Sequence, residues 1–106
     1  MKRYDIVWAT LDPTIGAEIA KTRPVVIVSL DELNKRLQTV TVCPITSQVH
    51  PAWRGRIKIR LKRRSAEIAV DQIRTISTSR LQERLGSLSD EEAAALRRLI
   101  TEMYGE

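Results

Sequence analysis

The chain has 106 residues, 42% of them hydrophobic, and a formal net charge of +5, which is typical of one globular domain. No apolar run approaches the ~20 residues that a membrane-spanning helix needs, and no signal peptide precedes the first expected strand. We therefore expect a cytoplasmic protein that does not bind membranes. A single cysteine, Cys43, excludes an internal disulfide and a cysteine metal cluster, and its apolar neighbours predict a small core residue.

Charge is unevenly distributed along the chain. Residues 33–66 contain nine Lys or Arg and no Asp or Glu, and 13 of all 18 basic residues are arginine. This segregation predicts one strongly positive face, whose commonest partner is nucleic acid. An acidic protein is the alternative partner, and the two are compatible. Arginine suits sites that bind phosphates by geometry as well as by charge.

The first part of the chain predicts two strands joined by a long loop. Residues 5–11 form the first expected strand, followed by a turn and a loop that is long enough to carry function. Residues 25–28 are a run of β-branched side chains, which predicts a strand buried on both faces. Pro24 holds Arg23 in an extended conformation at the strand entrance. Arg23 is there either a phosphate-binding cation or a solvated residue at a strand start.

A short helical turn at 31–36 and a strand at 39–43, stopped by Pro44, follow in the chain. The next expected strand, 56–62, alternates apolar residues with a ladder of cations, namely Arg56, Lys58, Arg60 and Lys62. Such a ladder either contacts nucleic acid or protects a sheet edge.

The last part of the chain predicts a bent strand region and one clear helix. Hydrophobic parity changes within 67–76 around Asp71 and Gln72, which predicts a bulge or bend. A short helical piece is expected at 79–85. Ser89 and Glu92 predict a capping box for a final helix that packs on the sheet. The predicted fold class is mainly β with a C-terminal helix (α+β), as a small antiparallel barrel or a strongly curved sheet.

Few kinds of catalytic chemistry fit these residues. Four scattered glycines form no phosphate loop, and one histidine with one cysteine makes no zinc site. His50 is expected at the surface of a basic loop, and Trp53 beside Arg54 either stacks on a base or packs at the rim. What remains is a site of Arg, Ser or Thr, acids and Gln. Such a site suits RNA cleavage by attack of a ribose 2′-hydroxyl on the adjacent phosphate.

Six segments in order along the chain together resemble the MazF/PemK (Kid) toxins of bacterial toxin–antitoxin systems: DIVW (5–8), LDPT (11–14), GAE (16–18), TRPVVIV (22–28), CPITS (43–47) and VDQIRTI (70–76). The resemblance implies an SH3-like barrel and cofactor-free, metal-independent, sequence-selective cleavage of single-stranded RNA to 2′,3′-cyclic phosphate and 5′-hydroxyl ends. It also implies a homodimer, neutralisation by an acidic antitoxin, and DNA binding only through the antitoxin complex.

The same resemblance assigns site residues. Arg23 matches the arginine that assists proton transfer and stabilises the phosphoryl charge, and Thr46 matches the threonine that contacts the scissile phosphate. The positions predicted to bind substrate are Glu18, Lys21, Ser47, Gln48, Trp53, Arg54, Arg56, Asp71 and Gln72. A role of Asp71 or Glu18 in proton transfer stays open. The alternative functions are a non-catalytic nucleic-acid-binding barrel or inactive toxin homologue, and a docking module for an acidic protein.

Overall fold

Seven strands form one curled antiparallel sheet in residues 1–50 and 52–105, the part of the chain that this computed structural model describes. The strands are β1 (Asp5–Thr10), β2 (Thr22–Ile27), β3 (Thr39–Thr46), β4 (Arg56–Leu61), β5 (Arg64–Ala69), β6 (Arg74–Ser77) and β7 (Leu81–Ser87). Two α-helices, α1 (Asp31–Arg36) and α2 (Asp90–Tyr104), and two 3₁₀ turns, Val70–Gln72 and Thr78–Arg80, complete the described elements.

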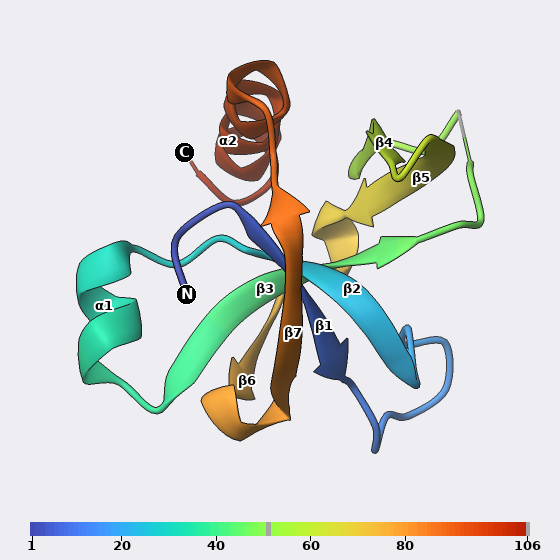
Figure 1. The fold of residues 1–106 in the computed structure, drawn as a ribbon. Coiled ribbons are helices and arrows are strands. Elements are labelled where there is room, and N and C mark those ends of the chain that lie inside the picture. Colours follow the sequence, from blue (N-terminus) through green and yellow to red (C-terminus); the bar gives the residue numbers. More distant parts are fainter. Residues whose placement is uncertain (51, 106) are drawn as a thin grey trace.

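The sheet curls into a half-barrel around its central strands (Figure 1). Its order is β4-β5-β3-β2-β1-β7, and β6 pairs with the first half of β3 while β5 pairs with its end. The α2 helix lies beyond one end of the sheet, near the β4–β5 hairpin (Figure 1). The α1 helix lies on the side of the molecule opposite that hairpin (Figure 1). The predicted mainly β fold with a C-terminal helix is confirmed.

The β2 strand is buried on both faces, as its run of β-branched residues predicts. Val25 and Ile27 belong to one hydrophobic cluster and Val26 and Val28 to a second one, so alternate side chains enter two cores. Each fully buried side chain of this size stabilises the fold by about 1.5–3 kcal/mol. Cys43 is fully buried in the second cluster, which confirms its prediction as a core residue.

The α2 helix begins with the predicted capping box. The Glu92 backbone N–H donates to Ser89 Oγ at 3.1 Å, and the Ser89 N–H donates to Glu92 Oε1 at 2.9 Å. Ala93 and Leu96 of this helix are buried in the second cluster. None of the helices in the described residues is long and apolar enough to cross a membrane.

Two predicted boundaries are wrong. The helical piece expected at 79–85 is limited to residues 79 and 80, which end a 3₁₀ turn. Residues 81–85 form most of β7, because the edge of β1 offers them a pairing partner. Pro44 does not end β3, which continues to Thr46. On one edge, β3 pairs with β6 through residues 39–42 and with β5 through residues 45–46. Pro44 lies between these two paired segments, where a proline without an N–H is tolerated. The parity change at 71–72 is a 3₁₀ turn between two strands, as predicted.

Candidate functional site

Three hollows lie in succession and share lining residues, so together they form one groove. The first, of about 320 Å³, is lined by Arg23 and Thr46 and is called the arginine hollow. The second, of about 350 Å³, is lined by Trp53 and also by Thr46. The third, of about 410 Å³, lies against the first loop and shares Asp71 and Gln72 with the second. A groove of this kind accommodates an extended strand more readily than a compact ligand.

Arg23 and Thr46 meet in the arginine hollow because of strand register. The antiparallel pairing of β2 with β3 places Val25 opposite Pro44, and continuing this register places Arg23 opposite Thr46. The Nε of Arg23 donates to the Ala20 carbonyl at 3.2 Å, which orients the guanidinium and leaves its two terminal nitrogens available. No carboxylate within residues 1–50 and 52–105 forms an ion pair with Arg23. Its charge is therefore available to an anionic ligand.

The Thr46 hydroxyl lies at the junction of two hollows and is only slightly exposed (residue exposure 7%). Its Oγ1 accepts a hydrogen bond from the Gln48 backbone N–H at 3.1 Å. That bond uses a lone pair of the oxygen, so the hydroxyl proton is free to be donated to a ligand oxygen. Ser47 lines the arginine hollow and Gln48 the second hollow, so both predicted neighbours reach the groove.

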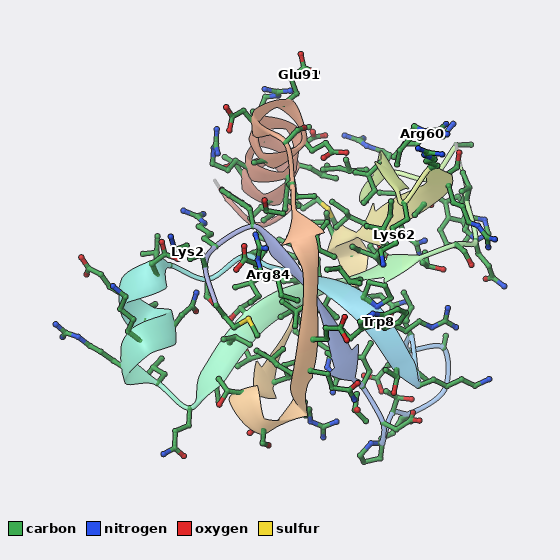
Figure 2. The ribbon with its side chains drawn as sticks, in the orientation of Figure 1. Lys2, Trp8, Arg60, Lys62, Arg84 and Glu91 are labelled. Carbon is green, nitrogen blue, oxygen red and sulfur yellow. The ribbon has the colours of Figure 1, made fainter. Side chains whose placement is uncertain are left out.

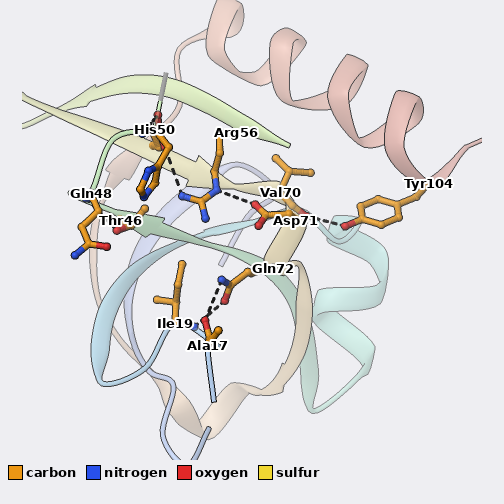
Figure 3. A network of polar contacts seen from close by, with 11 residues as sticks. Ala17, Ile19, Thr46, Gln48, His50, Arg56, Val70, Asp71, Gln72 and Tyr104 are labelled. Carbon is orange, nitrogen blue, oxygen red and sulfur yellow. Dashed lines mark hydrogen bonds and ion pairs between the residues drawn. The ribbon is translucent and has the colours of Figure 1, made fainter. Parts of the chain in front are cut away.

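Arg56 does not belong to an exposed ladder of cations, which corrects the pattern expected for residues 56–62. Its side chain is 6% exposed and lies 3.5 Å from Glu67 Oε1 and 2.8 Å from Asp71 Oδ1 (Figure 3). The Glu67 side chain is itself 3% exposed and also accepts the His50 backbone N–H at 2.8 Å. Lys58, by contrast, is exposed on the same strand. Arg56 therefore holds the second hollow together by pairing with two acids.

Trp53 stands at the rim of the second hollow with its side chain half exposed (53%). The His50 ring stacks on its indole with centroids 3.8 Å apart, and the Arg56 guanidinium lies 4.9 Å from the ring centroid. This packing fixes the orientation of the indole. Arg54, the other basic residue expected here, forms an ion pair with Glu102 of α2 and lines none of the three hollows.

Gln72 ties the first loop to the groove. Its Oε1 accepts the Ile19 backbone N–H at 2.7 Å, and its Nε2 donates to the Ala17 carbonyl at 3.4 Å (Figure 3). Glu18 lines the third hollow, where its Oε1 accepts the Ile15 N–H at 2.6 Å. Lys21 is exposed and lines none of the three hollows. The structure thus brings Arg23, Thr46 and Ser47 together and places Glu18, Asp71 and Gln72 further along the groove.

Three polar or aromatic residues of the groove were not predicted as site residues: Trp8 and Arg64 in the arginine hollow and Arg74 in the third. Arg64 reaches the hollow because a two-residue turn at 62–63 pairs it with Leu61. A turn of this type usually contains Asn or Gly, and this one contains neither, so the register could not be read. Within the described residues, no group of three or more His, Cys, Asp or Glu side chains is arranged to hold a metal ion.

Residues 2–104 match the family model described as PemK-like, MazF-like toxin of type II toxin–antitoxin system. The chain belongs to this toxin family. Endoribonuclease EndoA of Bacillus subtilis (strain 168) is 35% identical to this member over 96 residues, which are 86% of this chain and 83% of that protein. The family assignment made from the sequence is therefore confirmed.

Solved structures agree with the fold of this PemK/MazF-like toxin. Mycobacterium tuberculosis toxin MazF-mt6 is 25% identical, with a TM-score of 0.79 over 94% of this chain and 95% of that one. MazF from Deinococcus radiodurans has a TM-score of 0.86 at 21% identity, over 100% of this chain and 97% of that one. An endoribonuclease in complex with its cognate antitoxin, from a mycobacterial species, has a TM-score of 0.82 at 15% identity, over 99% of this chain and 95% of that one.

Proposed function

We propose that this toxin is a metal-independent, sequence-selective endoribonuclease that cleaves single-stranded RNA in the groove. The observation that carries the proposal is that Arg23 and Thr46 line the same hollow. The chain is also a member of a toxin family with a relative named as an endoribonuclease. A guanidinium without a carboxylate partner in the described chain and a hydroxyl with a free proton are suited to phosphate oxygens.

The reaction uses the nucleophile that RNA itself supplies. The ribose O2′ forms a bond to the adjacent phosphorus as the bond from phosphorus to O5′ breaks. The 2′-hydroxyl loses its proton and the departing O5′ gains one, which leaves a 2′,3′-cyclic phosphate and a 5′-hydroxyl. The protein must align the strand and stabilise the charge that develops on the phosphoryl oxygens.

Arg23 and Thr46 divide this task. The terminal nitrogens of Arg23 donate to the phosphoryl oxygens and assist proton transfer, while its Nε stays on the Ala20 carbonyl. Thr46 donates its hydroxyl proton to the scissile phosphate from the opposite strand. Asp71 is held by Arg56 and, like Glu18, lines hollows other than the arginine hollow. Both therefore serve to shape the groove and bind the strand.

The partners expected of this toxin follow from its charge and its relatives. Solved relatives include an endoribonuclease with its cognate antitoxin and MazE–MazF complexes from Deinococcus radiodurans. The net charge of +5 favours an acidic antitoxin that covers the groove. The toxin acts in the cytoplasm as a homodimer, and it reaches DNA only through the antitoxin complex. The first test is whether a small acidic protein is encoded beside this toxin. Co-expression of the two proteins, followed by size-exclusion chromatography, then tests the stoichiometry.

The decisive experiment compares the parent protein with an Arg23→Ala variant on a long single-stranded RNA in the presence of EDTA. We expect the parent to cut at a few short sequences and the variant to be slower by about 10²-fold or more. Arg36→Ala is the matched control, because Arg36 is exposed on α1 and lines none of the three hollows. The product ends should carry cyclic phosphate and a free 5′-hydroxyl.

Equal cleavage by the parent and the Arg23→Ala variant would refute the assigned role of Arg23. Tight, salt-sensitive RNA binding by the parent without any cut product would instead identify a non-catalytic binding protein. Cleavage that EDTA abolishes and Mg²⁺ restores would refute metal independence.

A further inference from the structure

The β4–β5 hairpin ends in a turn whose residues do not suit its backbone. Leu61 pairs with Arg64, so the turn consists of Lys62 and Arg63 alone. Both have positive φ, +50° for Lys62 and +68° for Arg63. A two-residue hairpin turn with two positive φ values strongly prefers Asn and Gly, because a larger side chain is strained there. Two cations occupy these positions in spite of that preference.

The charges around this turn are not neutralised within the described chain. Arg60, Lys62, Arg63 and Arg64, which we call the basic tip, take part in none of the four ion pairs among residues 1–50 and 52–105. The Arg60 guanidinium donates to the Arg63 carbonyl at 2.8 Å, so it folds over the turn. Arg60 and Lys62 lie on the side of the molecule away from α1 (Figure 2). The result is a concentrated, exposed positive charge.

The basic tip adjoins the arginine hollow. Leu61, Arg64 and Ser65 line that hollow together with Arg23 and Thr46. A strand that crosses the hollow beside Arg23 therefore passes the end of this hairpin. Successive phosphates of an extended single strand would meet first one cationic site and then the other.

We propose that the basic tip binds phosphates of the RNA strand that flank the scissile linkage, a role that rests on the endoribonuclease function proposed above. Protection of the sheet edge by charge would explain Lys58 and Arg60 on β4, but it does not require cations inside the turn. RNA is favoured over an acidic protein as the ligand because the tip shares its hollow with the two phosphate-binding residues. Arginine and lysine on this tip thus extend the contact beyond the reacting linkage.

A Lys62→Asn/Arg63→Gly variant separates this role from stability, since it removes two charges and gives the turn its preferred residues. The control, Lys35→Gln/Arg36→Gln, removes the same charge from the exposed face of α1. Binding to a single-stranded 2′-O-methyl RNA, which cannot be cleaved, is measured by fluorescence anisotropy between 50 and 200 mM salt. Cleavage of unmodified RNA is measured in parallel.

We expect the turn variant to melt at the parent's temperature or above it and yet to bind RNA more weakly. If each lost cation contacts one phosphate, the slope of log affinity against log salt falls by about 1.4. The parent then loses about sevenfold more affinity than the turn variant over this salt range, whereas the α1 control keeps the parent's slope.

An unchanged slope in the turn variant, beside a parent that cleaves RNA, would overturn the proposal and leave the endoribonuclease function intact. Binding to a poly-glutamate peptide is measured with the same variants. If the turn variant binds this peptide more weakly but binds RNA as the parent does, the proposal is also overturned, because the basic tip then docks an acidic protein. A parent that binds but does not cleave RNA would refute the endoribonuclease function, and the slopes would still test the tip.

Discussion

The side-chain amide of Gln72 accepts the backbone N–H of Ile19 at 2.7 Å, so two segments 53 residues apart are joined at the groove. The same side chain donates to the Ala17 carbonyl at 3.4 Å. Ile19 also packs against the first hydrophobic cluster, and the position of this loop shapes two hollows. We therefore expect Gln72 to act on RNA binding by positioning the loop.

Replacing Gln72 by Ala should release the loop. We expect a loss of about 1 kcal/mol in the free energy of unfolding, since one well-formed hydrogen bond contributes about that much. Hydrogen exchange at the Ile19 amide should accelerate, and KM for RNA should rise more than kcat falls. Gln38→Ala, at an exposed position outside the groove, serves as the control. Unchanged exchange at Ile19 would contradict the assigned bond.

Removing the Thr46 hydroxyl while keeping its shape should impair catalysis specifically. Thr46→Val retains the volume but cannot donate to a phosphate oxygen, and we expect kcat to fall by about 10²-fold, as for loss of one donor to a developing oxyanion. Thr46→Ser restores the donor and should recover most of the activity. A Thr46→Val protein with the parent's kcat would show that the hydroxyl is not used.

The ion pairs of Arg56 with Glu67 and Asp71 should contribute to the free energy of unfolding. Arg56→Leu leaves the Glu67 carboxylate buried without its cation, and we expect a loss of about 3 kcal/mol in urea unfolding. The double variant Arg56→Leu/Glu67→Leu should recover much of this loss, because the buried carboxylate is then removed and the remaining acid, Asp71, is 37% exposed to water. Lys58→Ala, on the same strand but exposed, should change stability by less than about 0.5 kcal/mol. Similar losses in the single and double variants would contradict this account.

Burial, with a smaller contribution from the negative charge of Asp71, raises the pKa of Cys43 to about 12. Above pH ~9 the unfolded chain releases the thiol proton while the folded chain retains it. Stability should therefore fall as pH rises from 9 to 12, by about 1.4 kcal/mol per pH unit. A Cys43→Ala variant should lack this component of the slope.

The two proteins are compared by urea unfolding at pH 8, 9 and 10, so that other titrating groups cancel. Tyr104, whose hydroxyl donates to the Val70 carbonyl at 2.9 Å, is the exception. Its pKa is raised first by burial and then by the charges of Cys43 and Asp71, so its titration differs slightly between the two proteins. Parallel slopes for the parent and the Cys43→Ala variant would show that the folded thiol titrates normally. Iodoacetamide should alkylate Cys43 only after unfolding.

Short sequence patterns predicted the helix and the strand whose formation depends on neighbouring residues in the chain. The capping box of Ser89 with Glu92 marks the start of α2, and the β-branched run at 25–28 marks a strand between two cores. Residues 81–85 were predicted as helix and form a strand, because they pair with the edge of β1. Tertiary pairing overrides propensity in such segments.

The candidate site was predicted as a set of residues but not as an arrangement. Arg23 and Thr46 were assigned through the family resemblance, and the structure places both in the lining of one hollow, while their catalytic roles stay predictions. The sequence could not indicate that Arg56 turns inward, since the partners that neutralise it, Glu67 and Asp71, lie on other segments of the chain. The alternation of apolar and basic residues along β4 shows which side chains share a face of the strand, but not which other segments cover that face.

The residues that line the groove come from both strands and loops. Arg23 and Thr46 lie on β2 and β3 at the centre of the sheet. Residues 11–21, 47–50 and 52–55, which supply much of the outer groove, lie in segments without strand pairing. Loops tolerate substitution far better than paired strands do. We therefore expect toxins of this fold to differ in the RNA sequences they select through changes in these two loops, while Arg23, Thr46 and the strands that hold them stay unchanged.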